Sequence, residues 1–324
     1  MTNFPNGVSS FGMPMTPAQA ANIRTGRVYW VSNNSTTPRS DVKVGQDIAH
    51  PAGGTFNRPF ATIDYAIGQC RANAGDTILV KEGHAETMTA TSLVVDVAGI
   101  TIIGLGSGAS KPTLTFNGTA DIITISGAST VFQNFRIVAA VGDVVTAFDV
   151  TAVDVKLLDI EATESSTFNF INIVTCSGAA NTADRLHIAR LYWVSDDAGS
   201  DGIVTTAGSI DGLLIEDCNV QLAAGVAAGL LVLLAADQQL TGFVARRNVL
   251  MSALVDTAGI LVGGTAATSS GFIYENHIRS LDAAGAAFLA AATTPIVLGN
   301  NWYTGALAEP LAINTVGATI YNNA

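Results

Sequence analysis

The stretches Ile215-Glu-Asp-Cys218, Ala245-Arg-Arg-Asn248 and Ile273-Tyr-Glu-Asn276 are copies of one short phrase, in which an apolar residue is followed, after two spacers, by a second key residue. About nine such phrases follow one another from Ile102 onward, and the second key residue changes from Leu or Phe to Asn along the chain. They end at Leu105, Phe135, Ile160, Leu191, Cys218, Asn248, Asn276, Asn300 and Asn323. The ends are about 23 to 31 residues apart, with a mean of about 27, a period typical of solenoids.

Composition supports a solenoid of thin strands. The chain of 324 residues contains 32 Gly, and only 13% of its residues are charged, which suits short strands better than helices with solvated faces. Short runs of strand-forming residues alternate with Gly, Asn, Asp or Ser over residues 76–324. Because this repeat leaves no room for a second core, we expect one elongated all-β domain of about nine coils.

The first 75 residues differ from the repeat. Residues 1–28 contain several Pro and Gly residues and no strand alternation, which predicts an extended N-terminal arm. Residues 29–75 read as a lead-in strand, a polar loop and a short helix over 60–70 that caps the first coil. The apolar stripe of that helix is Phe60, Ile63, Ala66, Ile67 and Cys70.

Stacking places equivalent positions of successive coils above one another. Asn248, Asn276, Asn300 and Asn323, with Cys218 before them, should therefore lie at one bend, where the amides form a ladder. The position before each phrase end should form a ladder of alternating charge with about 5 Å between rungs: Asn134, Asp159, Arg190, Asp217, Arg247 and Glu275. Alternation also predicts that Trp193 and Trp302 fill the bore and that Tyr192 faces solvent.

Nothing in the sequence forms a recognisable catalytic or metal-binding motif. The four His residues fit no metalloprotease or triad pattern, and arginines between successive acids argue against a general acid. Asp196, Asp197 and Asp201 could bind a hard cation, but a solvated turn fits them better. Cys70, Cys176 and Cys218 are far apart and are expected to be free buried thiols. We therefore expect no catalytic, cofactor or metal residues.

Charge and hydropathy exclude two classes of partner. With 15 Lys and Arg against 26 Asp and Glu, the net charge is −11, and no basic cluster offers a footprint for nucleic acid. The longest apolar run, 222–236, is interrupted by Gly and is too short for a membrane span. The N-terminus lacks the regions of a secretory signal, so we expect synthesis in a cytoplasm.

One outward-facing column is more apolar than a solvated surface should be. Its position is four residues before each phrase end, and it comprises Val131, Lys156, His187, Leu214, Val244, Phe272 and Ile296. An apolar stripe that spans several coils is usually covered by a partner. We expect Val131, Leu214, Val244, Phe272 and Ile296 to form the contact of a homotrimer.

Two resemblances extend this interpretation. The segments Arg58–Cys70, Ala74–Thr87 and 99–106 resemble the entry into right-handed parallel β-helices of the pectate-lyase-like superfamily. This resemblance implies the right-handed parallel β-helix fold, which carries many functions. Residues 3–15, Asn-Phe-Pro-Asn-Gly-Val-Ser-Ser-Phe-Gly-Met-Pro-Met, with Gly83-His-Ala-Glu-Thr87, resemble the opening of head structural proteins of tailed bacteriophages.

The second resemblance implies a non-enzymatic, usually trimeric decoration or cement protein on the capsid surface. On that interpretation the arm binds the major capsid protein through Phe4, Pro5, Val8, Phe11 and Met13, because an unstructured segment of this composition needs a partner to order it. The virion would then be the location of the chain. A tailspike-like depolymerase and an adhesin that binds a surface glycan without cleaving it remain open alternatives on the same scaffold.

Overall fold

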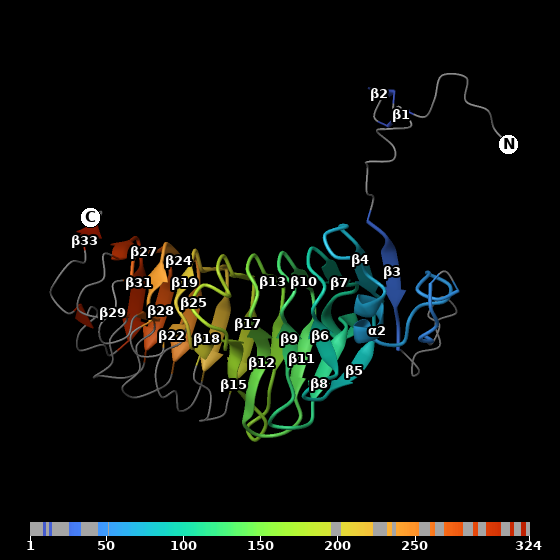
Figure 1. Ribbon diagram of the computed structural model, residues 1–324. Helices are drawn as coiled ribbons and strands as arrows, with labels where there is room; N and C mark the ends of the chain where they lie inside the picture. Colours follow the sequence, from blue (N-terminus) through green and yellow to red (C-terminus); the bar gives the residue numbers. More distant parts are fainter. Residues whose placement is uncertain are drawn as a thin grey trace.

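The computed structural model describes residues 26–33, 45–50, 52–195, 202–222, 232–234, 238–252, 260–262, 269–280, 288–290, 296–305, 312–313 and 319–321, with the pairs 9–10 and 13–14. Over these residues the chain forms a right-handed parallel β-helix, an elongated stack of coils that runs across Figure 1 from β3 (Val28–Val31) to β33 (Thr319–Tyr321). The all-β solenoid predicted from the repeat is confirmed.

The first sheet contains one strand from every coil and has eleven strands in chain order, all parallel. They are β3, β4 (Thr77–Val80), β7 (Thr101–Gly104), β10 (Val131–Gln133), β13 (Lys156–Leu158), β16 (His187–Ala189), β20 (Leu214–Glu216), β24 (Phe243–Arg246), β27 (Gly271–Tyr274), β30 (Ile296–Gly299) and β33.

The second sheet has nine strands: β5 (Ala85–Met88), β8 (Thr113–Phe116), β11 (Arg136–Ala139), β14 (Glu161–Thr163), β17 (Tyr192–Ser195), β21 (Asn219–Leu222), β25 (Val249–Ser252), β28 (His277–Ser280) and β31 (Trp302–Gly305). The third sheet has six: β6 (Leu93–Val95), β9 (Ile123–Ile125), β12 (Val144–Val150), β15 (Phe170–Cys176), β18 (Gly202–Thr206) and β22 (Val232–Leu234).

Three small pieces complete the described strands. The line of the third sheet resumes as a separate sheet of β26 (Ile260–Val262), β29 (Phe288–Ala290) and β32 (Ala312–Ile313). The strands β19 (Ile210–Asp211) and β23 (Leu240–Thr241) pair at a corner, and β1 (Ser9–Ser10) pairs with β2 (Met13–Pro14) in the arm. Six coils therefore run through all three sheets without interruption in the described part, compared with the about nine coils expected from the repeat.

The core is the bore of the coil, and register decides what fills it. Phe132 of β10 lies opposite Ile102 on one side and Leu157 on the other, so apolar residues meet apolar residues from rung to rung. Phe132 and Phe135 stack with ring centroids 4.3 Å apart, and both side chains are fully buried. The alternation of strands thus sends every second side chain inward.

The first sheet passes into the second through a two-residue turn that needs a left-handed residue. The first turn residue has positive φ in seven coils, at Asn134, Asp159, Arg190, Asp217, Arg247, Glu275 and Asn300. The second turn residue points inward, and in the later coils it is an amide. This turn is where the sequence predicted the amide ladder.

The amide ladder consists of Asn248, Asn276 and Asn301. Asn276 Oδ1 accepts hydrogen bonds from the backbone N–H of Asn248 at 3.0 Å and from its Nδ2 at 2.9 Å. Asn301 Oδ1 likewise accepts hydrogen bonds from the backbone N–H and from Nδ2 of Asn276, at 3.0 Å each. The predicted ladder was therefore right in kind but wrong at its third member, since Asn300 is exposed and occupies the left-handed position of the turn. Its fourth predicted member, Asn323, lies outside the described residues.

The N-terminal end of the coil is closed by the segment before β4. The helix α2 (Ile63–Gly68) begins after Thr62, whose Oγ1 accepts from the N–H of Tyr65 at 3.3 Å, and it buries Ile63, Ala66 and Ile67. The segment up to Phe60 pairs with the free edge of β3, because Phe60 N–H donates to Trp30 O at 2.7 Å. The predicted cap over 60–70 is confirmed, with a shorter helix than expected.

Candidate functional site

The outward face of the first sheet carries most of the polar contacts between coils, and left-handed residues bound it at both ends. The second boundary lies one or two residues before the strand in seven coils and comprises Gly75, Gly99, Ser129, Asp154, Arg185, Gly212 and Gly242. At both boundaries the left-handed residues of neighbouring coils lie above one another. Acids and arginines occupy several of these left-handed positions.

The expected charge ladder forms as separate pairs. Arg190 donates to both carboxylate oxygens of Asp159, at 2.5 and 2.8 Å. Arg247 binds Asp217 in the same bidentate way, at 2.7 and 2.8 Å. These pairs join adjacent coils, as the sequence predicted for this column.

The opposite boundary of the first sheet repeats the arrangement. Arg185 binds the carboxylate of Asp154 on the preceding coil, at 2.6 and 2.8 Å. The sequence analysis had not selected this pair. Its two residues are one coil apart along the chain, so the repeat spacing could have identified them.

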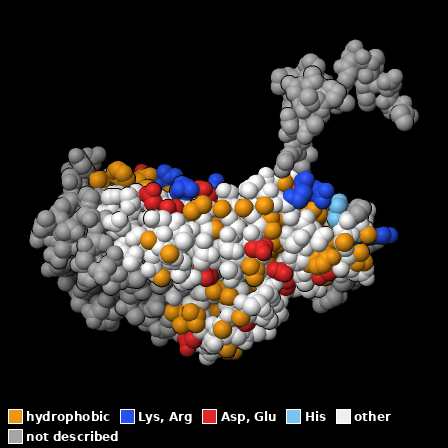
Figure 2. Space-filling view, viewed as in Figure 1, with side chains coloured by type: hydrophobic (Ala, Val, Ile, Leu, Met, Phe, Trp, Pro, Cys, Tyr) orange, Lys and Arg blue, Asp and Glu red, His pale blue; other side chains and the backbone are white. Residues whose placement is uncertain are grey.

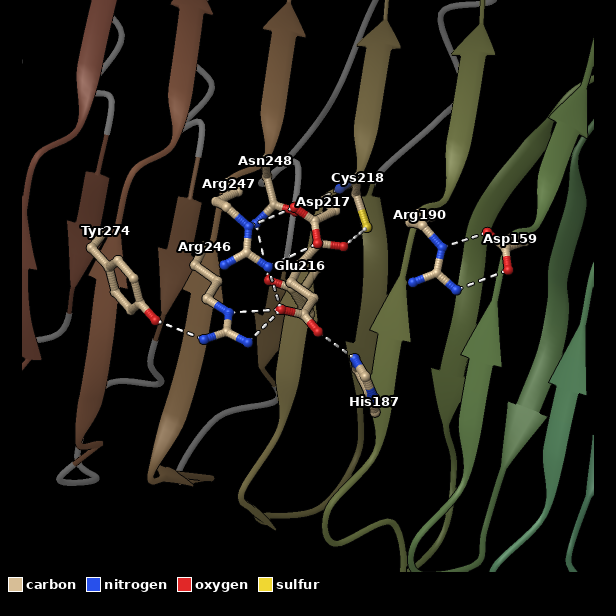
Figure 3. A network of polar contacts seen from close by, with 11 residues as sticks. Asp159, His187, Arg190, Glu216, Asp217, Cys218, Arg246, Arg247, Asn248 and Tyr274 are labelled. Atoms are coloured by element: carbon tan, nitrogen blue, oxygen red, sulfur yellow. Dashed lines mark hydrogen bonds and ion pairs between the residues drawn. The ribbon is translucent and has the colours of Figure 1, made fainter.

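A network centred on Glu216 occupies the middle of the face (Figure 3). Glu216 Oε2 accepts from Arg246 Nε at 2.6 Å and from a terminal nitrogen of Arg247 at 2.8 Å, while Glu216 Oε1 lies 2.9 Å from His187 Nε2. Arg246 also donates to the hydroxyl of Tyr274 at 3.0 Å. Four successive strands, β16, β20, β24 and β27, are joined by this one carboxylate and its partners.

The acids of this face are held ionised. Burial opposes ionisation of Glu216, but hydrogen bonds from Arg246 and His187 outweigh it and keep the pKa of Glu216 below its ordinary value of 4.5. The hydrogen bond from Arg190 lowers the pKa of Asp159. A general acid requires the opposite shift, so none of these carboxyls is suited to donate a proton near neutral pH.

The apolar column lies between the two rows of ion pairs. Val131, Leu214 and Val244 are half-buried, and 53% of the Phe272 surface is exposed. Pairing of β27 with β30 places Val297, not Ile296, beside Phe272, because Ile296 lies opposite Gly271. Ile296 therefore does not belong to the column in which the sequence analysis put it. Figure 2 shows acidic and basic side chains close together along the upper edge of the molecule.

The remaining sequence predictions fall into two groups. As predicted, Trp193 is fully buried and Tyr192 is 47% exposed. Trp193 also donates a hydrogen bond to Glu164 Oε1 at 2.7 Å. Trp302 was expected in the bore, but it is 51% exposed, because the shift from Asn300 to Asn301 turns it outward. Phe4, Pro5, Val8 and Phe11 lie outside the described residues, as do Asp196, Asp197 and Asp201, and of Met13 only the backbone pairing in β2 is described.

A buried polar pair near the N-terminal cap escaped the sequence analysis. His84 Nδ1 accepts from the N–H of Asn33 at 2.9 Å, and Glu86 Oε2 lies 3.0 Å from His84 Nε2. Glu86 Oε2 also accepts from the N–H of Ile63, the first residue of α2, at 3.3 Å. The signal was the spacing of two residues within one strand phrase, which puts both side chains on the same, inward face.

No other feature of the described ranges adds a reactive group. No group of three or more metal-ligating side chains is present there, and no helix is long and apolar enough to cross a membrane. A cavity of about 790 Å³ in the lead-in loop is lined by Gln46, Ile48, Ala52, Gly53, Asn57, Arg58 and Pro59. Because none of these lining residues is an acid, the cavity offers no acid–base pair.

A solved structure with a similar fold supports the architecture. A pectin methylesterase from carrot superposes with a TM-score of 0.58 over 92% of this chain and 89% of that chain, at 10% identity. A rhamnogalacturonan lyase matches with a TM-score of 0.42 at 12% identity, over 85% of this chain and 73% of that chain. The GH136 lacto-N-biosidase from Eubacterium ramulus matches with a TM-score of 0.43 at 11% identity, over 94% of this chain and 68% of that chain.

No protein-family model and no curated protein matches the sequence. At such identities the likeness shows the fold alone, the parallel β-helix.

Proposed function

We propose that the chain is a non-enzymatic structural protein of a bacteriophage virion, a trimeric decoration protein that binds the major capsid protein through its N-terminal arm. The observation that carries the non-enzymatic part is the pairing of the acids on the first sheet. Asp159, Glu216 and Asp217 each accept hydrogen bonds from arginine, and their pKa values are lowered. The resemblance of residues 3–15 to phage head proteins supports the virion part.

Self-association is supported by the apolar column of the first sheet. A phenylalanine that is 53% exposed beside half-buried Leu214 and Val244 would be covered in an oligomer, and the ion pairs on both sides would form its polar rim. The chain mass of 33.3 kDa gives an expected mass of about 100 kDa for a trimer in light scattering. Phe272→Arg should shift this mass toward that of the monomer.

Val145→Arg is the matched control, because Val145 is equally exposed, at 52%, but lies on β12 of the third sheet. A wild-type mass of one chain at micromolar concentration would overturn the trimer. Equal effects of the two substitutions would overturn the assignment of the contact to the first sheet.

Capsid binding is tested with phage heads that lack the chain. The purified protein should co-sediment with them, and Phe4→Ala combined with Phe11→Ala should abolish this without changing the thermal unfolding of the body. A protein that releases oligosaccharides from a capsular or cell-wall polymer, without binding heads, would instead be the depolymerase that the fold also permits.

A further inference from the structure

The outward face of the second sheet divides into a half with ion pairs and a half whose described side chains carry no charge. In the first half, Glu161 binds Arg136 at 2.9 Å and lies 3.5 Å from Lys111. From β17 onward, Arg279 is the one charged residue at an outward position of the described strands, where it pairs in register with Met251, and the described outward side chains are uncharged. They are Tyr192, Val194, Asn219, Gln221, Val249, Met251, His277 and Trp302. On a chain of net charge −11, such a stretch is an exception.

Aromatic rings lie at both ends of this stretch. Tyr192 is 47% exposed and Trp302 is 51% exposed, and pairing runs in register from Tyr192 through Asn219, Val249 and His277 to Trp302. Four strand spacings separate the two rings, a distance of about 19 Å. His277 stacks on Trp302 at 4.5 Å with an interplanar angle of 23°, which fixes the orientation of the indole before any ligand arrives.

Amides lie between the rings. Gln221 Nε2 donates to Asn219 Oδ1 at 3.1 Å, which orients both side chains and leaves Gln221 Oε1 as an acceptor and Asn219 Nδ2 as a donor. Both residues are only half-buried. An oriented donor and acceptor between two exposed aromatic rings suit a ligand that carries many hydroxyl groups and apolar C–H faces.

We propose that the stretch of the second sheet from Tyr192 to Trp302 binds a neutral linear glycan that runs along the axis of the solenoid. A polyanion such as nucleic acid or an acidic polysaccharide needs several cations along its path. The outward positions of this stretch offer one, Arg279, and the net charge of the chain repels a polyanion. The regular spacing of the rungs favours a linear polymer, whose repeating units meet equivalent positions on successive coils. The site lies on a different sheet from the proposed trimer contact, so the two proposals stand independently.

The test uses the full chain and a panel of neutral hexasaccharides, namely cello-, chito-, malto- and xylohexaose. The chain has three Trp residues, and Trp302 is half exposed while Trp193 is fully buried. At least one hexasaccharide should therefore change the tryptophan fluorescence, at concentrations up to about 10 mM, which covers millimolar affinity. Polygalacturonate, as the acidic control, should bind more weakly than the best neutral ligand.

Variants locate the site by calorimetric titration of that ligand. Tyr192→Ala and Trp302→Ala should each weaken binding about 3- to 10-fold, because each removes one stacking ring. Phe272→Ala, an equally exposed aromatic on the first sheet, should leave the affinity unchanged. Light scattering and thermal unfolding of each variant report the oligomeric state and the fold.

Three results would overturn the proposal. One is the absence of binding by every neutral hexasaccharide. Another is a preference for polygalacturonate. The third is a loss of oligomer mass in Trp302→Ala, since it would make this face a contact between copies of the chain.

Discussion

Replacing Asn276 by Ala should destabilise the protein far more than replacing the neighbouring ladder candidate Asn300. The Asn276 side chain is fully buried. Its Oδ1 is the acceptor for the N–H of Asn248 at 3.0 Å, and its Nδ2 donates to the carbonyl of Ala245 at 3.0 Å. The substitution leaves both backbone groups without these partners in a dry turn.

The cost follows from those two groups. A buried backbone group without a partner costs about 1–3 kcal/mol, so the two together cost about 2–6 kcal/mol. For a chain of this size about 1 kcal/mol lowers the Tm by about 2 °C, so a decrease of about 4–12 °C is expected. Because repeat proteins can unfold in parts, hydrogen exchange of residues 245–250 and 273–278 should report the loss locally as faster exchange of the Asn248 amide.

The control is Asn300→Gly. Asn300 is exposed and has φ of 49°, a conformation that Gly adopts without strain, so its Tm should stay within about 2 °C of the wild type. Protein concentration is held constant, because oligomerisation would make Tm depend on it. An unchanged Tm in Asn276→Ala, or an equal decrease in both variants, would refute the hydrogen-bonding ladder as the source of stability.

Three further predictions concern other parts of the chain. His84→Leu leaves the largely buried Glu86 carboxylate without its imidazole and should lower the unfolding free energy by about 3 kcal/mol in urea titrations, whereas adding Glu86→Leu should restore part of the loss. The pKa of Asp159 is lowered in the folded protein, so this residue adds stability that is fully present above its pKa in the unfolded chain, near 4. That stability is lost as the pH falls through the folded pKa. The Tm of the wild type should therefore decline more steeply below pH 4 than the Tm of Asp159→Asn. Burial raises the pKa of Cys176 and Cys218 to about 12, so both thiols should react slowly with a disulfide reagent at pH 8 until urea unfolds the chain; rapid labelling of the native protein would contradict their burial.

The sequence predicted the solenoid because the phrase combines two physical requirements at a fixed period. An inward apolar residue must recur in every coil, and the turn that follows must tolerate a left-handed residue, which Asn and Asp do better than most. Both requirements can be recognised in a single sequence, without knowing what the chain binds. The capping helix was predictable for a similar reason. A helix with an apolar stripe directly before the first strand must pack that stripe against the coil.

Register was the part that the sequence could not decide. Both Val297 to Asn300 and Leu298 to Asn301 fit the phrase of an apolar residue and an Asn three positions later. Only the hydrogen bonds between Asn276 and Asn301 select the second frame. The one-residue difference moved Ile296 out of the apolar column and turned Trp302 from the bore to the surface, as any register shift in a strand must.

The spacing of His84 and Glu86 could have placed this buried pair on one inward face, but the sequence could not identify the distant partners of the pair. Its partners are backbone groups of Asn33 and Ile63, which lie about 51 and 23 residues away. A side chain that satisfies a distant backbone group follows no local spacing. Glu216 binds side chains of neighbouring coils rather than backbone groups, and its network, which extends over four coils, became visible only when the strands were aligned.

The division of the surface between two sheets makes the two proposals separable. Each coil presents the first and second sheets in different directions, because the two-residue turn with Asp159, Asp217 or Arg247 lies between them. A partner that covers Phe272 on the first sheet therefore need not contact Trp302 on the second. Loss of the trimer in Phe272→Arg with retained glycan affinity, and loss of glycan affinity in Trp302→Ala with retained trimer mass, are the combined results that this geometry requires; a variant that abolished both would mean that the faces act as one surface.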